Sequence, residues 1–320
     1  MSPLTRLIGA LACASLLPLT LAVAAAAAPA SSRTPARVAA PNDALWGAQW
    51  GVRAAGGAGL WRWGTGSRKT IVAVLDTGVD ASHPDLRGAL VAGWNAFAKS
   101  RDTHDDNGHG TLVAGVVAAR ANNRAGIAGY CPSCSIMPVK VLDASGQGPG
   151  AVIAAGIDWA VRHHATIVNM SITLDHSDSA VQAAIARAVA RGVLVVAASG
   201  NVGGADAHYP AAYPGVISVG GVDAAGALYG WSTFGSWVTA SMPGCNETTS
   251  AGGGYLDFCG SSSATAAMSG LVALAASDAP HVRSALRSLI ARYRLAAVRR
   301  LAGGAFVRAA VGLDRGRRNG

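Results

Sequence analysis

Four polar residues of this 320-residue chain stand where an α/β fold would bring side chains together. Asp76 and Asn201 each follow an apolar run with the character of a buried strand, and His109 and Ser262 each open a segment with a helical pattern. In an open α/β sheet, the carboxyl ends of the strands and the amino ends of the following helices lie along the same edge. We therefore expect the four side chains to meet at one edge of one sheet.

These four residue types together suit acyl transfer to a serine nucleophile. A serine hydroxyl is a weak nucleophile until a base removes its proton, and the ordinary pKa of histidine suits His109 to that role near neutral pH. Asp76 can hold the imidazole tautomer and stabilise the imidazolium. The backbone N–H of Ser262, at the start of a helix, and the side-chain amide of Asn201 can donate to the oxyanion that forms.

Each motif also has a purely structural explanation. Asp76-Thr-Gly is a common turn, the glycine after His109 suits a loop, and the serines that follow Gly260 suit a helix N-cap. Asp105 and Asp106, just before His109, are interpreted as a solvated turn that could tune the environment of the histidine. Three motifs that each stand in a strand–turn–helix context favour the catalytic interpretation, because chance explains one such match more easily than all three.

Alternating strand and helix patterns position these residues. Near-continuous runs of apolar residues predict strands that are buried on both faces, as in a parallel sheet. The predicted strands are 70–75, 136–142, 166–170, 193–198 and 216–219, and the predicted helices are 110–121, 151–163, 179–190 and 262–276. This alternation predicts a three-layer α/β fold with a mostly parallel, doubly wound sheet and helices on both faces.

Three segments resemble the signature blocks of the subtilisin-like serine proteases, namely Asp76-Thr-Gly-Val-Asp80, His109-Gly-Thr-Leu-Val-Ala-Gly115 and Gly260-Ser-Ser-Ser-Ala-Thr265. The order aspartate, histidine, serine along the chain is also the order of that family. The resemblance extends over residues 41–277, and Asn42-Asp43 and Gln49-Trp-Gly51 are similar to the thermitase-like branch. It implies a serine endopeptidase that hydrolyses protein or peptide substrates through an acyl-enzyme.

The resemblance also implies where a substrate would bind. One wall of the site would be an edge strand that pairs with the substrate backbone, and the other would follow the strand at 166–170. The residues implied are Ser145, Gly146, Gln147 and Gly148 on the first wall, Ser171, Ile172 and Thr173 on the second, and Gly200. The second wall is rich in glycine in the family, whereas this chain has Thr173 and Leu174 there. This difference predicts a narrower first specificity pocket that accepts large aromatic side chains poorly.

A calcium site is a further implication of the resemblance. Asp43, Asp85 and Asn123 match the side-chain ligands of the family's strong site, and loop carbonyl groups near Ala125 and Ile127 would complete it. Hard oxygen ligands from separate loops suit Ca²⁺. The alternative is a solvated aspartate and two turn residues.

Four cysteines remain when Cys13, inside the N-terminal apolar run, is set aside. An even number in an exported chain suggests two disulfides, and the nearest pairing joins Cys131 to Cys134 and Cys245 to Cys259. A zinc site of four cysteines is the alternative. It is disfavoured because thirteen residues separate the second pair, and structural zinc sites usually have closer spacing.

The N-terminal segment has the pattern of an export signal. Arg6 precedes an apolar run over 7–28, and Ala28-Pro-Ala30 fits a cleavage site for a signal peptidase. We expect a signal peptide at 1–30, a linker at 31–41 and a peptidase domain at 42–280, in a protein secreted to the extracellular space or the cell envelope. A retained membrane anchor is the alternative, because the apolar run is long for a signal peptide.

Charge is divided unevenly along the chain, whose formal net charge is +9. Residues 1–280 hold 16 basic and 16 acidic residues, whereas residues 281–320 hold ten arginines and one aspartate. The neutral first part gives no indication of nucleic-acid binding, and we expect a monomer. The basic C-terminal helix and tail at 281–320 could attach weakly to anionic surfaces or pack on the domain with its arginines in water. A catalytically silent binding protein attached by this tail is the alternative to an enzyme.

Overall fold

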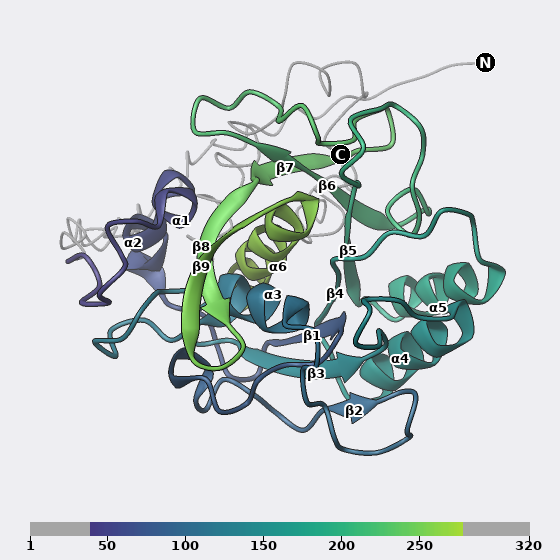
Figure 1. The fold of residues 1–320 in the computed structure, drawn as a ribbon, viewed down its shortest axis with the longest axis horizontal. Helices are drawn as coiled ribbons and strands as arrows, with labels where there is room; N and C mark the ends of the chain where they lie inside the picture. Colours follow the sequence, from purple (N-terminus) through teal and green to yellow (C-terminus); the bar gives the residue numbers. More distant parts are fainter. Residues whose placement is uncertain (1–38, 278–320) are drawn as a thin grey trace, which may run out of the picture. The chain divides into compact units, whose positions relative to one another are not determined.

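Seven parallel strands form the main sheet, and two antiparallel strands form a separate hairpin (Figure 1). The structure is a computed structural model that describes residues 39–277. The main sheet has the order β2-β3-β1-β4-β5-β6-β7, and the hairpin is β8-β9. The strands are β1 (Ile71–Asp76), β2 (Trp94–Asn95), β3 (Ser135–Lys140), β4 (Ile167–Met170), β5 (Leu194–Ala198), β6 (Val216–Val222), β7 (Ala240–Pro243), β8 (Cys245–Ser250) and β9 (Gly254–Cys259).

The helices, in chain order, are α1 (Trp50–Ala54), α2 (Gly57–Leu60), α3 (His109–Ala118), α4 (Gly150–Arg162), α5 (Ser179–Ala190) and α6 (Ser261–Ala276). Helices α3, α4 and α5 connect β2 to β3, β3 to β4 and β4 to β5 in the main sheet. Short 3₁₀ turns occupy Trp61–Trp63 and Pro84–Leu86.

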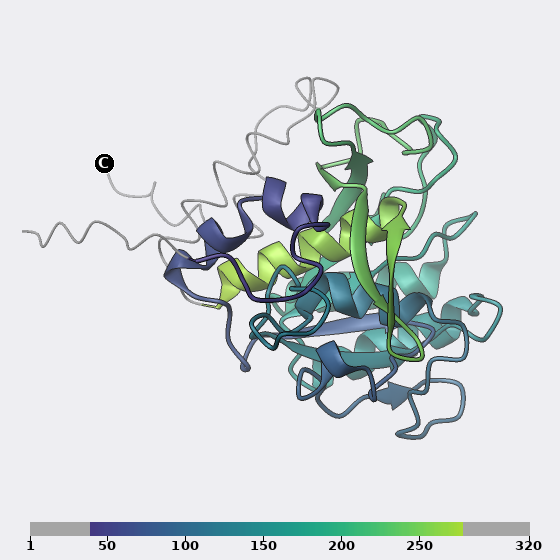
Figure 2. The same ribbon diagram turned by 60° about the vertical axis from the view of Figure 1, so that its left-hand side comes forward.

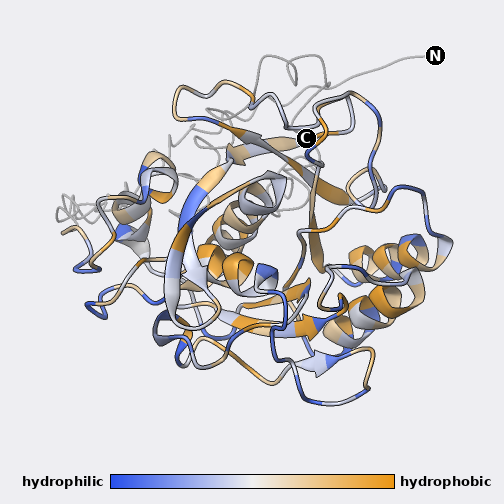
Figure 3. Cartoon of the chain, in the orientation of Figure 1, coloured by the Kyte–Doolittle hydropathy of each residue, from blue (hydrophilic) through white to orange (hydrophobic). Residues whose placement is uncertain are grey.

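Successive residues of the central strand β1 face two different cores. Val72 and Val74 pack with residues of α3 and α6, whereas Ala73 and Leu75 pack with residues of α4 and α5. All four are at most 1% exposed. Because both faces of the sheet are covered, its strands are apolar along most of their length, as the orange strands of Figure 3 show. The expected three-layer, doubly wound α/β fold is confirmed.

Every strand and helix predicted from the apolar and helical patterns is present, with ends shifted by up to three residues. The largest extension is in β6, which continues past Val219 through Gly220 and Gly221 to Val222. The elements that were not expected are α1, α2, β2, β7 and the hairpin β8-β9. β2 has only two residues and β8 is mostly polar, so a search for long apolar runs does not find them.

The order of the strands reverses at β1. β2 and β3 lie on one side of β1, and β4 to β7 lie on the other. In such sheets a crevice opens at the carboxyl ends of the strands that flank this point. Asp76 is the last residue of β1 and Ser171 directly follows β4, so both stand at the crevice.

The helix α6 lies in the interior of the described domain (Figure 2). All of its residues from Ser263 to Ala275 are buried, and it contacts α3, β1 and the strands β4 to β7. A helix that is buried on all sides needs small or apolar residues around its whole circumference, which α6 has. In Figure 2 it runs, in yellow-green, beside α1 and α2, whose residues share its apolar core.

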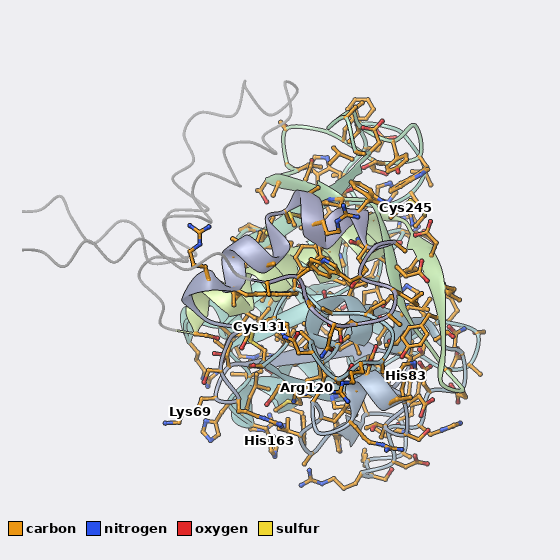
Figure 4. All side chains as sticks on the ribbon, turned by 90° about the vertical axis from the view of Figure 1, so that its left-hand side faces the viewer. Lys69, His83, Arg120, Cys131, His163 and Cys245 are labelled. Carbon is orange, nitrogen blue, oxygen red and sulfur yellow. A yellow bond between two sulfur atoms is a disulfide. The ribbon has the colours of Figure 1, made fainter. Side chains whose placement is uncertain are left out.

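Two disulfides close loops of the described chain. Cys131–Cys134 closes a short loop between α3 and β3, and Cys245–Cys259 joins directly opposed residues of β8 and β9. Figure 4 labels one cysteine of each pair. The structure therefore contains the two pairs expected from the sequence and not a shared four-cysteine metal site.

Some of the expected segments lie outside the described residues. These are the signal peptide at 1–30, most of the linker at 31–41 and the basic tail at 281–320. Within residues 39–277, no helix combines the length and the apolar character needed to cross a bilayer.

Candidate active site

His109 and Asp76 form a hydrogen-bonded pair at the crevice. His109 is the first residue of α3, and its Nδ1 lies 2.8 Å from Oδ1 of Asp76 at the end of β1. The first turn of α3 approaches the turn after β1 so closely that a Cβ on Gly110 would lie 2.0 Å from the carbonyl oxygen of Gly78. Only glycine at position 110 therefore allows the helix to begin where His109 can reach Asp76.

The surroundings of His109 favour its charged form. Burial opposes the imidazolium, but the charge of Asp76, its hydrogen bond and the charge of Asp105 together raise the pKa of His109 above its ordinary value of 6.5. Because a carboxylate can only accept, Nδ1 carries the proton that faces Asp76, and the neutral ring offers Nε2 as an acceptor. The ring of Phe258 packs edge-on against the imidazole, with 5.5 Å between ring centroids.

Ser262 stands in the first turn of α6, against the segment that follows β4. Its hydroxyl donates to the carbonyl oxygen of Ser171 at 3.1 Å, and the hydroxyl of Ser171 donates to the carbonyl oxygen of Ser262 at 3.1 Å. The backbone N–H of Ser262 belongs to the first turn of the helix, where N–H groups have no intrahelical acceptor. The hydroxyl of Ser262 and its backbone N–H are thus both held at the first turn of α6.

The side chain of Asn201 is oriented by the same helix start. Its Oδ1 accepts a hydrogen bond from the backbone N–H of Ser261 at 2.8 Å, and the N–H of Gly200 donates to the hydroxyl of Ser261 at 3.2 Å. Oδ1 of Asn201 is thus occupied by a hydrogen bond within the protein, whereas the amide nitrogen can donate to a ligand. Asn201 and the N–H of Ser262 therefore supply two donors of the kind that stabilise an oxyanion.

A cleft of about 270 Å³ lies in front of His109. The predicted substrate-binding residues that line it are Gly146, Gln147, Gly148, Ser171, Ile172 and Thr173. Ser262 is not among the lining residues, but its hydroxyl donates to the carbonyl oxygen of Ser171, which is one of them. Ser145 and Gly200 are not among the lining residues, although Gly200 supports the adjacent helix start.

The segment at 145–148 is a turn and not the edge strand expected from the sequence. The carboxylate of Asp143 accepts hydrogen bonds from the N–H and hydroxyl of Ser145 and from the N–H of Gln147, which curls the segment. This is the local bonding that makes aspartate a strong turn former. Among the described residues, the carbonyl oxygen of Gly146 and the N–H of Gly148 have no hydrogen-bond partner.

The opposite wall of the cleft carries larger side chains than a glycine-rich wall would. Thr173 is exposed to the cleft, and Leu174 is half-buried with its N–H donating to the carbonyl oxygen of Tyr209 at 2.6 Å. Leu174 also packs against the core on the side of α4 and α5. The wall is therefore fixed at Leu174, and Thr173 projects from it.

The sequence model of the subtilase family (Peptidase S8) matches residues 67–301, which is most of the chain. The chain belongs to the subtilase family.

Several curated relatives of this subtilase have names that describe proteolysis. Thermitase of Thermoactinomyces vulgaris is 36% identical over 253 residues, which are 78% of this chain and 90% of thermitase. A thermostable alkaline protease of Halalkalibacterium halodurans is 44% identical over 219 residues, 68% of this chain and 58% of that protein. A thermophilic serine proteinase of Bacillus sp. strain AK1 is 38% identical over 240 residues, 74% of this chain and 60% of that protein.

The chain thus spans less than two thirds of the last two relatives but most of thermitase. The resemblance to the subtilisin-like proteases, and to their thermitase-like branch, is confirmed.

The residues suggested as calcium ligands are also brought together in this subtilase. Asp43 is 5% exposed and Asp85 is fully buried. Asn123 links them, because its backbone N–H lies 3.3 Å from Asp43 Oδ1 and its Nδ2 lies 2.7 Å from Asp85 Oδ1. The N–H groups of Ala125 and Ile127 complete this loop through hydrogen bonds to Asn123 Oδ1 and Asp85 Oδ2.

This oxygen-rich cluster is suited in kind to a hard cation. Burial raises the pKa of Asp43, the charge of Asp85 raises it further, and hydrogen bonds from the backbone of Asn122 and Asn123 only partly oppose them. Two buried carboxylates of like charge are stabilised by a divalent cation. Within residues 39–277, no cluster of three or more His, Cys, Asp or Glu side chains is arranged for a metal, so such a site would also need amide and carbonyl oxygens.

The interpretation of Asp105 as part of a solvated turn was wrong. Asp105 is only 5% exposed, and its carboxylate accepts hydrogen bonds from Thr77, Gly108 and Thr111. Asp106 is exposed and pairs with Lys140 Nζ at 2.7 Å. The signal in the sequence was an acidic residue shortly before a helix start, which is typical of capping interactions. Its burial depends on the packing of β1 against α3, which no local pattern reveals.

Proposed function

We propose that this subtilase is a serine endopeptidase with Asp76, His109 and Ser262 as its catalytic triad and Asn201 in its oxyanion hole. The observation that carries the proposal is the 2.8 Å bond between Asp76 and His109 beside a cleft whose wall residue Ser171 is hydrogen-bonded to Ser262. Asn201 bonds to the backbone N–H of Ser261, directly before Ser262. The printed names of thermitase, the alkaline protease and the serine proteinase support the same reaction class.

The reaction begins when the hydroxyl of Ser262 turns from the carbonyl of Ser171 toward Nε2 of His109. His109 takes the proton while Ser262 Oγ attacks the scissile carbonyl carbon, and Asp76 stabilises the imidazolium. The oxyanion is stabilised by the amide of Asn201 and the N–H of Ser262. His109 then gives its proton to the leaving amine, and water attacks the acyl-enzyme by the same route in reverse.

The two walls of the cleft position the substrate as an extended chain. The carbonyl of Gly146 and the N–H of Gly148 are free to pair with its backbone on one side, and Thr173 faces it on the other. Main-chain pairing of this kind gives affinity for peptides of varied sequence. Side-chain pockets along the cleft then set preference.

Fluorophosphonate labelling and casein hydrolysis test this assignment, with the parent chain beside Ser262→Ala. We expect the parent to label and to cleave, and Ser262→Ala to do neither. In subtilisin, the corresponding loss of the nucleophile lowers kcat by about 2 × 10⁶. Ser236→Ala, at an exposed serine, is the matched control and should behave as the parent does. A folded parent that neither labels nor cleaves would favour the catalytically silent binding protein instead.

We also propose that Asp43, Asp85 and Asn123 hold Ca²⁺, together with carbonyl groups of the loop around residues 125–127. The support is the burial of two neighbouring carboxylates and the raised pKa of Asp43. The bound ion would neutralise their charge and join the chain near residue 43 to the loops at 85 and 123. Its role would be structural, because none of these residues lines the cleft.

Export is proposed from the N-terminal sequence and the two disulfides, since disulfides persist in oxidising compartments. Intact mass and N-terminal sequencing of the protein in the culture medium would test cleavage after Ala30. Mature protein that retains residues 1–30 in the membrane fraction would instead indicate an anchor.

A further inference from the structure

Asp105 lies between the two elements that carry the proposed catalytic pair. On one side is the turn after β1, with Asp76 and Thr77, and on the other is the first turn of α3, which carries His109. The side chain of Asp105 bonds to both sides. It does not line the cleft, so no substrate contact explains its burial.

Oδ1 of Asp105 connects the strand end to the loop before the helix. It accepts from the hydroxyl of Thr77 at 2.7 Å and from the N–H of Gly108 at 2.8 Å. The same hydroxyl of Thr77 accepts from the N–H of Gly110 at 3.0 Å. Thr77, which follows Asp76, is therefore tied to Gly110, which follows His109, through a hydroxyl that Asp105 orients.

Oδ2 of Asp105 caps the helix. It accepts from the N–H of Thr111 at 2.8 Å and from the hydroxyl of Thr111. That hydroxyl in turn accepts from the N–H of Asp80 at 2.9 Å, so the loop beyond β1 is joined as well. One buried carboxylate thus sets the spacing between β1 and α3.

The network keeps Asp105 ionised. Burial raises the pKa of Asp105, but hydrogen bonds from Thr111, Gly108 and Thr77 outweigh burial and lower it below the ordinary value. Asp105 is therefore a fixed negative charge, and it is one of the groups that raise the pKa of His109.

Other charged groups surround the pair. Asp76 faces His109 from β1, and Lys140 of β3 donates to the carbonyl oxygen of Thr77 at 2.5 Å and to Asp106. His104, on the same loop as Asp105, is exposed. Because Lys140 is paired with exposed Asp106, the buried carboxylates of Asp76 and Asp105 are the negative charges that act on the imidazole.

We propose that Asp105 is a positioning residue for the proposed peptidase. It holds α3 at the distance from β1 that the bond between His109 and Asp76 needs, and its charge stabilises the imidazolium that forms during acyl transfer. This inference rests on the proposed function, since it assigns Asp105 a part in that reaction.

Asp105→Asn tests both parts of the proposal. The amide removes the charge and cannot accept at both of its ends. We expect kcat to fall about 10- to 100-fold with KM changed less than threefold, because small misplacements of reacting groups are costly. We also expect the acidic limb of kcat/KM to move to lower pH, because His109 loses a charge that favours its protonation.

Thr77→Val separates position from charge. It breaks the link from Thr77 to Asp105 and Gly110 but keeps the carboxylate. We expect kcat to fall while the acidic limb stays within a few tenths of a pH unit of the parent's. Asp223→Asn is the matched control, since Asp223 accepts from the N–H groups of Ala225 and Ala227 in a turn outside the cleft. It should leave kcat and the pH profile unchanged.

NMR titration of His109 supplies a readout that needs no turnover. It is measured in a Ser262→Ala background, with His109→Gln used to assign the signal, and Asp105→Asn should lower the titration midpoint of His109. If the parent fails to react with fluorophosphonate, the proposed function fails, while the titration still tests the effect of Asp105 on His109. Folded Asp105→Asn with unchanged kcat and an unchanged His109 midpoint would overturn the inference. So would a loss of activity that only follows the unfolded fraction while the midpoint stays fixed.

Discussion

Thr173 determines much of the shape of the cleft beside the proposed nucleophile. Its neighbour Leu174 is anchored to Tyr209 and to the core, so the wall cannot easily withdraw. A substrate side chain next to the scissile bond therefore meets a branched, exposed residue where the resemblance implies glycine. The prediction of a narrow first specificity pocket, made from the sequence, stays a prediction.

Thr173→Gly should widen that pocket. We expect kcat/KM for peptides with Phe before the scissile bond to rise about tenfold relative to peptides with Ala, because one methylene group more or less in a pocket is worth about 1–3 kcal/mol. Thr173→Ser removes one methyl group. Its ratio of kcat/KM for Phe and Ala peptides should lie between the ratios of the parent and of Thr173→Gly. Cleavage after Phe as fast as after Ala by the parent would contradict the prediction.

The pH dependence of the proposed reaction follows from His109. Its neutral form accepts the proton of Ser262, so kcat/KM should fall as the pH falls through the raised pKa of His109, with a midpoint above 6.5 in the parent. Asp76→Asn removes the charge that does most to raise this pKa, so the midpoint should move to lower pH. In a chymotrypsin-type serine protease, which has the same triad on an unrelated fold, the corresponding substitution also lowers kcat by about 10⁴. A midpoint that rises in Asp76→Asn would show that a group other than His109 controls the fall of kcat/KM at low pH.

At the residue scale, the sequence predicted the groups that stand at the ends of regular elements. Asp76, His109 and Ser262 could be placed because each follows or opens a long apolar segment. Asp105 and Thr77 could not, because their roles arise from the contact between β1 and α3. The turn at 145–148 was missed for a different reason, namely that Asp143 bonds to its own neighbours more readily than the segment extends.

At the scale of elements, the hairpin β8-β9 joins two distant parts of the domain. At its tip, the N–H of Gly252 donates to Asp80, and the carbonyl oxygen of Gly254 bonds to His83 at 2.9 Å. At its base, the Cys245–Cys259 disulfide stands three residues before Ser262. The hairpin escaped prediction because its stability comes from these anchors and not from an apolar pattern.

Removing this disulfide should destabilise the protein more than removing the other one. By loop length, the double substitution of Cys245 and Cys259 by Ser should lower the free energy of unfolding by about 3 kcal/mol, against about 2 kcal/mol for Cys131 and Cys134. For a domain of this size, these values correspond to decreases in Tm of about 6–12 °C and 4–8 °C. Calorimetry in the Ser262→Ala background measures both. The reverse order of Tm values would show that native packing, and not loop length, decides the effect.

At the scale of the whole molecule, the proposed calcium site ties together segments that lie far apart in the sequence. Asp43, Asp85 and Asn123 come from three loops, and Tyr255 of β9 faces Asp85. Burial and the charge of Asp85 raise the pKa of the Tyr255 hydroxyl, which therefore stays protonated and can donate to that carboxylate. An ion at this point would stabilise the fold and the hairpin together.

Removal of calcium should therefore lower Tm. At free Ca²⁺ 100 times its Kd, binding adds about 2.7 kcal/mol to the free energy of unfolding. EGTA should then lower Tm by about 5–10 °C. Asp85→Asn should abolish the response, whereas Asp206→Asn, at an exposed carboxylate, should keep it. Equal Tm values of the parent in Ca²⁺ and in EGTA would rule out a stabilising site.

The architecture as a whole was predictable because strands and helices alternate over much of the chain and the strands are apolar along most of their length. Strands such as 193–198 can be buried on both faces only in a covered parallel sheet. The order of the strands was not predictable. It depends on which side of β1 each crossover turns, and that choice is made by long-range packing around α6.

The position of α6 has a consequence for the timing of activity. This helix is the last element of the described chain, it fills the space between α3 and five strands, and it carries Ser262 near its first residue. A chain that has been synthesised or translocated only as far as residue 260 lacks both the centre of its core and the proposed nucleophile. In the proposed mechanism, folding of the core and the capacity to cut other proteins therefore depend on the same segment, Ser261–Ala276.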